Sequence, residues 1–117
     1  MDLYCYEGVV VRWKDGDTVV VEIDRGYDDR SVKTYRLARI DCPETHGARA
    51  SEAGRLATAF VEERMPSGTK LLVRSVKTAT GKERATLGRY VAELYLRDVN
   101  VSDMLVENGH AAYVTFG

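Results

Sequence analysis

The chain has 117 residues, of which 44% are hydrophobic and 30% are charged, and its formal net charge is −1. This composition is typical of a globular domain and excludes a disordered chain, while no apolar run approaches the roughly 20 residues that span a bilayer. The near-neutral charge excludes bulk electrostatic attraction to nucleic acid, so any site for anions must be local.

We expect one domain over residues 1–117, long enough to bury a core without covalent cross-links. Its two cysteines, Cys5 and Cys42, could form at most one disulfide, and free thiols are the default. The first residues, "MDLYCYEGVV", lack the basic and apolar segments of a signal peptide. This predicts a cytoplasmic monomer with no membrane partner; a secreted form after removal of a leader is the alternative.

The first third of the chain predicts three strands. The segments "LYCYEGVVVRW" (Leu3 to Trp13) and "TVVVEI" (Thr18 to Ile23) are rich in β-branched and aromatic residues. After the turn cluster "DRGYDDRS", the near alternation of "VKTYRLARI" (Val32 to Ile40) predicts a third strand. The second and third strands should form a hairpin with a loop longer than two residues.

A helix is predicted next, over Ser51 to Met65. Apolar residues recur there at intervals of three and four, and Ser51 can serve as the N-cap. The segment "KLLVRSV" (Lys70 to Val76) predicts a fourth strand, "KTATGKERATLG" a polar loop, and "RYVAELYL" (Arg89 to Leu96) a fifth strand.

A short helix is predicted over Val101 to Gly109, with Ser102 as the cap and Gly109 as the stop, and "HAAYVTF" can add a short strand. Five strands with a helix after the third and another after the fifth predict a mainly β, α+β fold. The pattern matches a five-stranded Greek-key barrel of the OB type with two helices. A doubly wound α/β fold would need a helix after nearly every strand.

Charged residues gather at the predicted strand ends. They lie in three segments: "DGDT" (Asp15, Asp17), "YRLARIDCPE" (Arg36, Arg39, Asp41, Glu44) and "LGRY" (Arg89). Phosphodiester cleavage needs an activated water, cationic donors for the charge that develops in the transition state, and oxygen ligands for a hard divalent ion. The two histidines and two cysteines lack the spacing of a zinc site.

These segments together resemble the staphylococcal nuclease (thermonuclease-like) family. "DGDTVVV", "YRLARIDCPE", "LGRYVAELYL" and "VSDMLVENGHA" follow the family's order and spacing over nearly the whole chain. The resemblance implies a Ca²⁺-dependent endonuclease that hydrolyses DNA, RNA or both and leaves 3′-phosphates. It also implies the roles of six residues: metal ligands Asp17, Asp41 and the carbonyl of Cys42, a general base or water-orienting Glu44, and phosphate-binding Arg36 and Arg89.

The sequence also departs from the family. Thr86 and Leu87 replace a lysine and a tyrosine that contact the nucleotide, and the third helix of the family is expected to be absent. An alternative therefore stays open, a catalytically inactive module of the same family that binds nucleic acid or protein. Taken singly, each charged residue also has a structural explanation, since Asp-Gly forms turns and arginines are commonly exposed on strands.

Overall fold

The computed structural model describes residues 5–43, 51–76, 85–86 and 89–114. Three long strands open the chain: β1 (Cys5–Asp15), β2 (Thr18–Asp24) and β3 (Arg30–Leu37). β2 pairs antiparallel with both β1 and β3. Valines and other β-branched residues fill β2, whose side chains are nearly all buried, because this strand lies between two neighbours.

Two further strands complete the barrel. β5 (Lys70–Ser75) pairs antiparallel with β1, and β7 (Arg89–Leu96) pairs antiparallel with β5. β7 also pairs in parallel with β3, which joins the two ends of the β3-β2-β1-β5-β7 order. The closed five-stranded barrel of the OB type is thus confirmed, and closure leaves these strands without a free edge along the paired segments.

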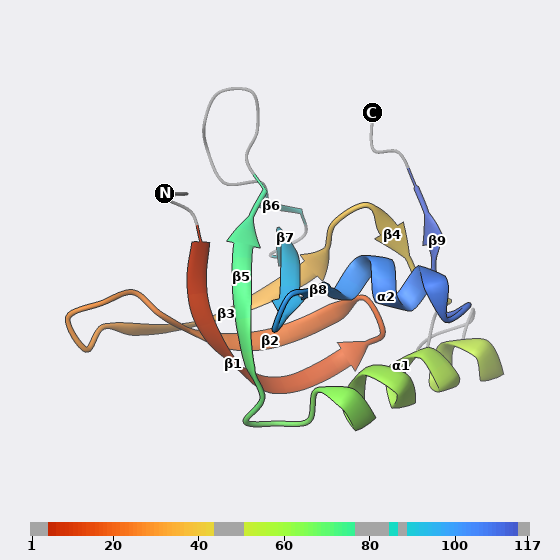
Figure 1. Ribbon diagram of the computed structural model, residues 1–117, viewed down its shortest axis with the longest axis horizontal. Helices are drawn as coiled ribbons and strands as arrows, with labels where there is room; N and C mark the ends of the chain where they lie inside the picture. The colour runs from red at the N-terminus through yellow and green to blue at the C-terminus, as the bar shows by residue number, and fades with distance from the viewer. Residues whose placement is uncertain (1–4, 44–50, 77–84, 87–88, 115–117) are drawn as a thin grey trace.

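The first helix, α1 (Glu52–Arg64), begins where the sequence predicts. Ser51 is its N-cap and accepts a hydrogen bond from the backbone N–H of Gly54 at 3.0 Å. Ala57, Phe60 and Val61 form the buried face of the helix. α1 packs across β1 near the end that leads into β2 (Figure 1).

The second helix, α2 (Val101–Glu107), corrects one detail of the sequence analysis. Its N-cap is Asn100, whose Oδ1 accepts from the backbone N–H of Asp103 at 3.0 Å. Ser102, the predicted cap, is buried and donates its hydroxyl to the carbonyl of Ala38 at 2.9 Å. Gly109 follows the helix with a φ of +78°, as expected of a stop residue.

Four two-residue strands complete the described elements, and one of them lies in the "HAAYVTF" segment that was expected to add a short strand. The third predicted strand breaks after Leu37, and Ile40 and Asp41 form β4 (Ile40–Asp41), which pairs with β9 (Ala112–Tyr113). β6 (Ala85–Thr86) lies inside the predicted polar loop and pairs with the start of β7, and β8 (Val99–Asn100) pairs with its end. Within the described residues, α1 and α2 are the only α-helices, in line with the predicted pair.

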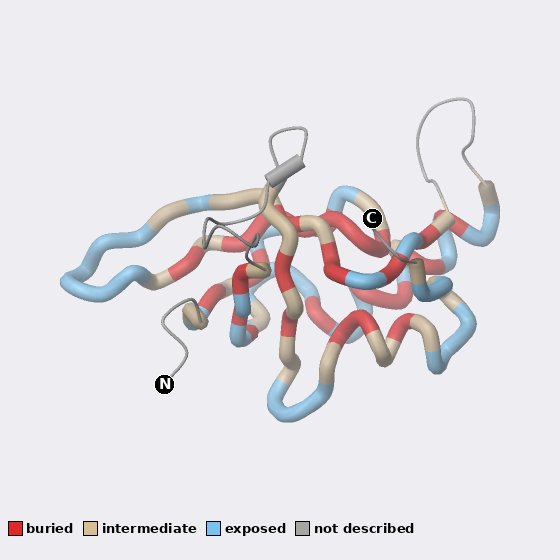
Figure 2. The backbone as a smooth tube through the Cα atoms, turned by 90° about the horizontal axis from the view of Figure 1, so that it is seen from above, coloured by how far each residue is buried: buried red, intermediate tan, exposed pale blue. Residues whose placement is uncertain are grey.

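The core runs through the barrel and under α1. Figure 2 shows the buried segments along the barrel strands and the exposed ones at the turns. Trp13 is 7% exposed and donates its indole N–H to the carbonyl of Met65 at 2.9 Å, which fixes the end of α1 to β1. Of the described helices, neither is long and apolar enough to cross a membrane.

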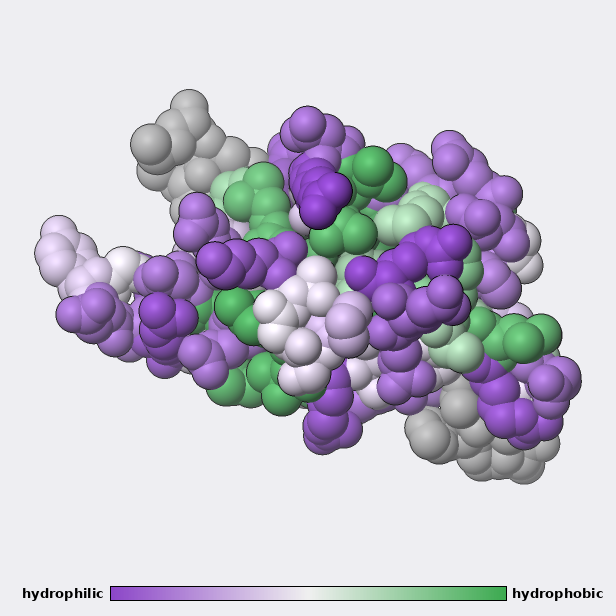
Figure 3. All heavy atoms as spheres, turned by 60° about the horizontal axis from the view of Figure 1, so that its bottom comes forward, coloured by the Kyte–Doolittle hydropathy of each residue, from purple (hydrophilic) through white to green (hydrophobic). Residues whose placement is uncertain are grey.

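The β2–β3 hairpin projects from the barrel, with Tyr27 fully exposed near its tip (Figure 1). Exposed apolar side chains on the face in Figure 3 form separate groups among hydrophilic ones. A groove of about 550 Å³ is lined by residues at the β1 start, the β2 end and the β7 end, among them Glu7, Asp24 and Tyr95. Of the predicted site residues whose side chains the structure describes, none lines this groove.

Candidate active site

Asp17, Arg36, Asp41 and Cys42 come together at one end of the barrel, opposite the projecting hairpin. The β1–β2 turn consists of Gly16 and Asp17, and the first residue of β2, Thr18, pairs with Arg36 near the end of β3. Arg36 in turn pairs with Val91, two residues into β7. The same end of the barrel therefore holds the "DGDT" turn, the Arg36 segment and the start of β7.

Gly16 is required by packing rather than by an unusual backbone. Its φ is not in the left-handed region, but a Cβ there would lie 3.0 Å from Cβ of Ala57 and 3.2 Å from Sγ of Cys42. α1 and Cys42, the residue after β4, thus pack directly against the turn, which leaves no room for a side chain. Asp15, the last residue of β1, pairs with Thr18 and so shapes the turn, as predicted.

Asp17 is almost fully buried, with only 5% of its surface exposed. Its Oδ2 accepts the backbone N–H of Cys42 at 3.0 Å and Nη1 of Arg36 at 3.4 Å, and its Oδ1 accepts the hydroxyl of Thr18 at 3.2 Å. Burial raises the pKa of this carboxyl, and the Cys42 amide and the Arg36 charge oppose the shift only in part. The fold therefore holds a carboxylate in a place where its charge is costly.

Arg36 joins the two predicted carboxylate ligands. Nη1 donates to Oδ2 of Asp17 at 3.4 Å, and Nη2 donates to Oδ1 of Asp41 at 3.1 Å and to the carbonyl of Ile40 at 3.3 Å. The Arg36 side chain is 18% exposed, that of Asp17 8% and that of Asp41 59%. The cluster thus reaches from the buried turn to the open surface.

Cys42 contributes its backbone rather than its thiol. The residue is buried, and burial together with the charges of Asp17 and Asp41 raises the pKa of the thiol to about 12. Such a thiol stays protonated near neutral pH and is a poor nucleophile. The side chain fills space against Gly16, while the amide ties the end of β4 to Asp17.

The donor set fits a hard divalent cation. Two carboxylates converge on one guanidinium, so their negative charges already favour a cation at this place, and the carbonyl of Cys42 belongs to the same segment. Calcium takes six to eight oxygen ligands, so three protein oxygens would leave the remaining positions to water and a phosphate. No group of three or more His, Cys, Asp or Glu side chains in the described part of the chain could hold a metal by itself.

The two remaining predicted catalytic residues are Arg89 and Glu44. Arg89 opens β7 and its backbone pairs with Thr86, which places the residue at the same end of the barrel as Arg36. Glu44 lies outside the described residues, one position after Pro43. Leu87, the second departure from the nucleotide-binding pattern, also lies outside them.

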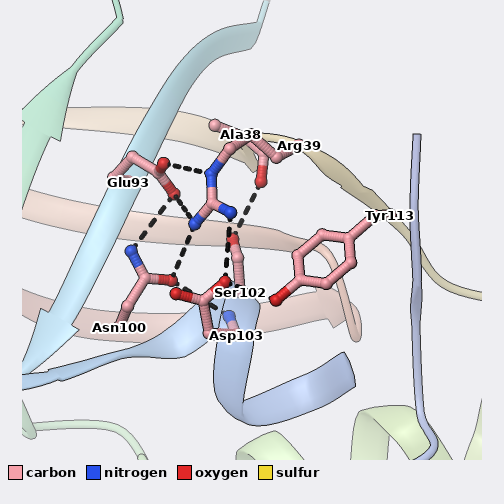
Figure 4. A network of polar contacts seen from close by, with 7 residues as sticks. All are labelled: Ala38, Arg39, Glu93, Asn100, Ser102, Asp103 and Tyr113. Atoms are coloured by element: carbon pink, nitrogen blue, oxygen red, sulfur yellow. Dashed lines mark hydrogen bonds and ion pairs between the residues drawn. The ribbon is translucent and has the colours of Figure 1, made fainter. Parts of the chain in front are cut away.

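One polar network was missed by the functional interpretation of the sequence. The sequence analysis placed Arg39 among the charged residues at the strand ends without giving it a role, and its guanidinium contacts Glu93, Asn100 and Asp103 (Figure 4). These partners lie more than fifty positions away, so no local sequence pattern links them. The only local sign was the position of Arg39 between two predicted site residues, Arg36 and Asp41.

Two carboxylates and an arginine thus cluster at one end of a closed barrel of the OB type. The chain belongs to the staphylococcal nuclease homologue family, whose model matches residues 34–117. Comparison with curated proteins gives no significant match. The matched range includes Arg36, Asp41 and Arg89, while Asp17 precedes it and reaches these residues through its contacts with Cys42 and Arg36.

Proposed function

We propose that the protein is a Ca²⁺-dependent nuclease that hydrolyses phosphodiester bonds of DNA, RNA or both at internal positions and leaves 3′-phosphates. One observation carries the proposal: a single guanidinium, that of Arg36, contacts both Asp17 and Asp41, at 3.4 and 3.1 Å, at the edge of the barrel. Membership of a nuclease family supports the choice of reaction. The open position of Asp41, 59% exposed, suits an extended polymer.

Each residue has a role that follows from its chemistry. Asp17, Asp41 and the Cys42 carbonyl hold the metal, which supplies Lewis acidity toward a phosphate oxygen and the attacking water when bound. Arg36 and Arg89 donate to the phosphate oxygens, where their forked N–H groups neutralise charge that grows in the transition state. Glu44 accepts a proton from the water or orients it.

The buried half of the site sets the geometry for the open half. Asp17 has little freedom because three groups donate to it, while Asp41 meets solvent. A ligand fixed in advance loses less conformational entropy on binding than a mobile one. Asp17 thus anchors the ion, and Asp41 completes the site at the surface.

A cleavage assay tests the proposal. The purified protein should degrade single-stranded DNA or RNA with Ca²⁺ and lose that activity with a chelator. Arg36→Ala should lower kcat/KM by about 10²–10³-fold, the range seen when one fixed transition-state donor is removed. Arg55→Ala is the matched control, since Arg55 pairs with Glu52 on the exposed side of α1. Well-folded protein that cuts neither polymer under either condition would refute the nuclease proposal.

An inactive binding module is the second candidate, and one observation favours it. Both terminal nitrogens of Arg36 already donate to carboxylates, so the guanidinium has fewer donors for a phosphate than an unpaired arginine would. Calcium titration followed by melting temperature separates the two candidates. A nuclease should gain stability as Ca²⁺ binds, and a module without a metal site should not.

A further inference from the structure

Arg39 lies in the turn between β3 and β4, the short connection that separates Arg36 from Asp41. Its backbone is left-handed, with a φ of 69°, a conformation that residues with a Cβ seldom adopt. A non-glycine residue at such an angle persists only where its surroundings hold it in place. Contacts of the Arg39 side chain and of the turn backbone hold the residue in this conformation.

The guanidinium of Arg39 makes a forked contact with β7 and a third contact with α2. Nε lies 2.5 Å from Oε2 of Glu93, Nη2 lies 3.2 Å from Oε1 of Glu93, and Nη1 lies 3.0 Å from Oδ1 of Asp103. Nη2 also donates to Oδ1 of Asn100 at 3.3 Å. We call this cluster, Arg39 with Glu93, Asn100 and Asp103, the Arg39 clamp (Figure 4).

The partners in the Arg39 clamp are fixed by one another. Asn100 caps α2 through the same Oδ1 and donates Nδ2 to Glu93 at 3.4 Å. The hydroxyl of Tyr113 donates to Oδ1 of Asp103 at 2.7 Å, and its ring centroid lies 5.7 Å from the guanidinium carbon of Arg39. An isolated exposed ion pair contributes little, but a network of charges with forked geometry loses less entropy for each contact.

Backbone hydrogen bonds tie the same turn to the same elements. Ala38 donates its N–H to the carbonyl of Ala92 in β7 at 2.9 Å and accepts the hydroxyl of Ser102 from α2 at 2.9 Å. The carbonyl of Arg39 accepts the N–H of Val114 at 2.8 Å. The turn is therefore held by β7, by α2 and by the segment that follows β9.

The position of this turn sets the distance between two predicted site residues. Arg36 reaches across it, since its Nη2 contacts both the carbonyl of Ile40 and the carboxylate of Asp41. The strand that receives the Arg39 fork is β7, which begins with Arg89. A shift of the turn relative to β7 would therefore change the spacing of Arg36, Asp41 and Arg89 together.

We propose that Arg39 is a positioning residue of the candidate active site, whose clamp holds the β3–β4 turn so that Arg36 and Asp41 keep their relative placement. The claim about catalysis rests on the proposed nuclease function; the claim about placement does not. Glu93, Asn100 and Asp103 act as the fixed partners of the clamp.

Arg39→Gly is the decisive variant, because glycine adopts a positive φ readily and so leaves the turn no harder to form. Any effect on the site then reports the lost side chain rather than backbone strain. Arg39→Lys keeps the charge but replaces the fork with a single ammonium. Arg55→Ala removes an arginine that pairs with an acid on α1 and serves as the control.

The first readout is amide hydrogen exchange, which needs neither metal nor substrate. The N–H of Cys42 donates to Asp17 and reports whether the end of β4 stays in place, while the amide of Val21, in the centre of β2, reports global stability. Arg39→Gly should speed exchange at Cys42 about tenfold and leave Val21 within about twofold, the mark of local opening. Equal acceleration at both amides, or none at Cys42, would overturn the proposal.

The second readout is steady-state cleavage at a temperature where every variant is folded. Arg39→Gly should lower kcat about 10- to 100-fold with KM within about threefold, since small misplacement of catalytic groups can cost 10²-fold. Arg39→Lys should recover part of the loss, and Arg55→Ala should match the wild type. An unchanged kcat for Arg39→Gly would overturn the catalytic part. If the wild type itself cuts nothing, the nuclease proposal fails, and the exchange experiment still decides whether the clamp positions the turn.

Discussion

Cys42 donates its backbone N–H to Oδ2 of Asp17 at 3.0 Å, and this single bond connects the β1–β2 turn to the end of β4. The two residues are 25 positions apart in the chain. Because the bond uses the amide of one predicted metal ligand and the carboxylate of another, it sets their relative placement before any ion binds. The resulting site combines a buried carboxylate with an exposed one, and this asymmetry underlies the first prediction.

Asp17→Asn should leave the melting temperature unchanged or raise it. Burial raises the pKa of Asp17 above its ordinary value, so the folded state holds the charged form at a cost at neutral pH. An asparagine keeps the shape and can still accept the Cys42 amide through Oδ1. Thermal unfolding at pH 7 without metal is the measurement. A fall of about 5 °C or more corresponds to roughly 1 kcal/mol in a domain of this size. Such a fall would show that the charged Asp17 side chain stabilises the folded state, contrary to the prediction.

Gly16→Ala should destabilise the protein by about 1–3 kcal/mol, the usual range for overpacking. The added Cβ would lie 3.0 Å from Cβ of Ala57 and 3.2 Å from Sγ of Cys42. Denaturant unfolding of Gly16→Ala, Ala57→Gly and the double variant forms a cycle. The double variant should be more stable than the sum of the single effects predicts, since Ala57→Gly removes the closest atom. Simple additivity would show that the contact with α1 is not the cause.

The thiol of Cys42 should resist alkylation in the folded protein. Burial is the chief cause that raises the pKa of this thiol to about 12, so little thiolate forms at pH 8. Burial also keeps the reagent away from the sulfur. Mass spectrometry after iodoacetamide treatment should find Cys5, which is partly exposed, modified well before Cys42. In denaturant both should react at similar rates. Rapid modification of Cys42 in folded protein would contradict the packing described around Gly16.

The contribution of the Arg39 clamp to stability should depend on pH through the ionisation of Asp103. The Tyr113 hydroxyl and then Arg39 lower the pKa of this carboxyl below its ordinary value. A depressed pKa stabilises the fold above the unfolded-state value and loses that contribution as the pH falls through the folded-state value. The melting-temperature gap between wild type and Asp103→Asn should therefore be largest near neutral pH and close below about pH 4.

The exposed Asp98, in the turn between β7 and β8, provides the control as Asp98→Asn. The melting-temperature gap between the wild type and Asp98→Asn is measured at the same pH values for comparison. A gap for Asp103→Asn that widens as the solution becomes acidic would contradict the direction given for its pKa.

Much of the barrel could be predicted because its strands carry local patterns. β7 has the predicted bounds, and Ser51 caps α1, since alternation and capping act within a few residues. The break after Leu37 was not predictable in this way. The near alternation of "VKTYRLARI" predicts one strand through Ile40, whereas the turn at Arg39 depends on partners in β7 and α2.

The same distinction between local sequence signals and distant contacts applies to the candidate site. The charged residues were found from their order in the chain, and the structure brings Asp17, Arg36 and Asp41 into contact. The cap of α2 was assigned to Ser102, but the buried carbonyl of Ala38 takes its hydroxyl, and Asn100 caps the helix instead. Local sequence gives both residues similar capping preference, so only the tertiary contact decides between them.

The most direct test of the account is calorimetric titration of Ca²⁺ into the wild type, Asp17→Asn and Asp41→Asn, all without nucleic acid. The account predicts one ion for each wild-type chain and affinity reduced at least about tenfold in either variant, because both carboxylates serve the same ion. Variants that bind Ca²⁺ as tightly as the wild type, or a folded wild type that binds none, would contradict the shared metal site.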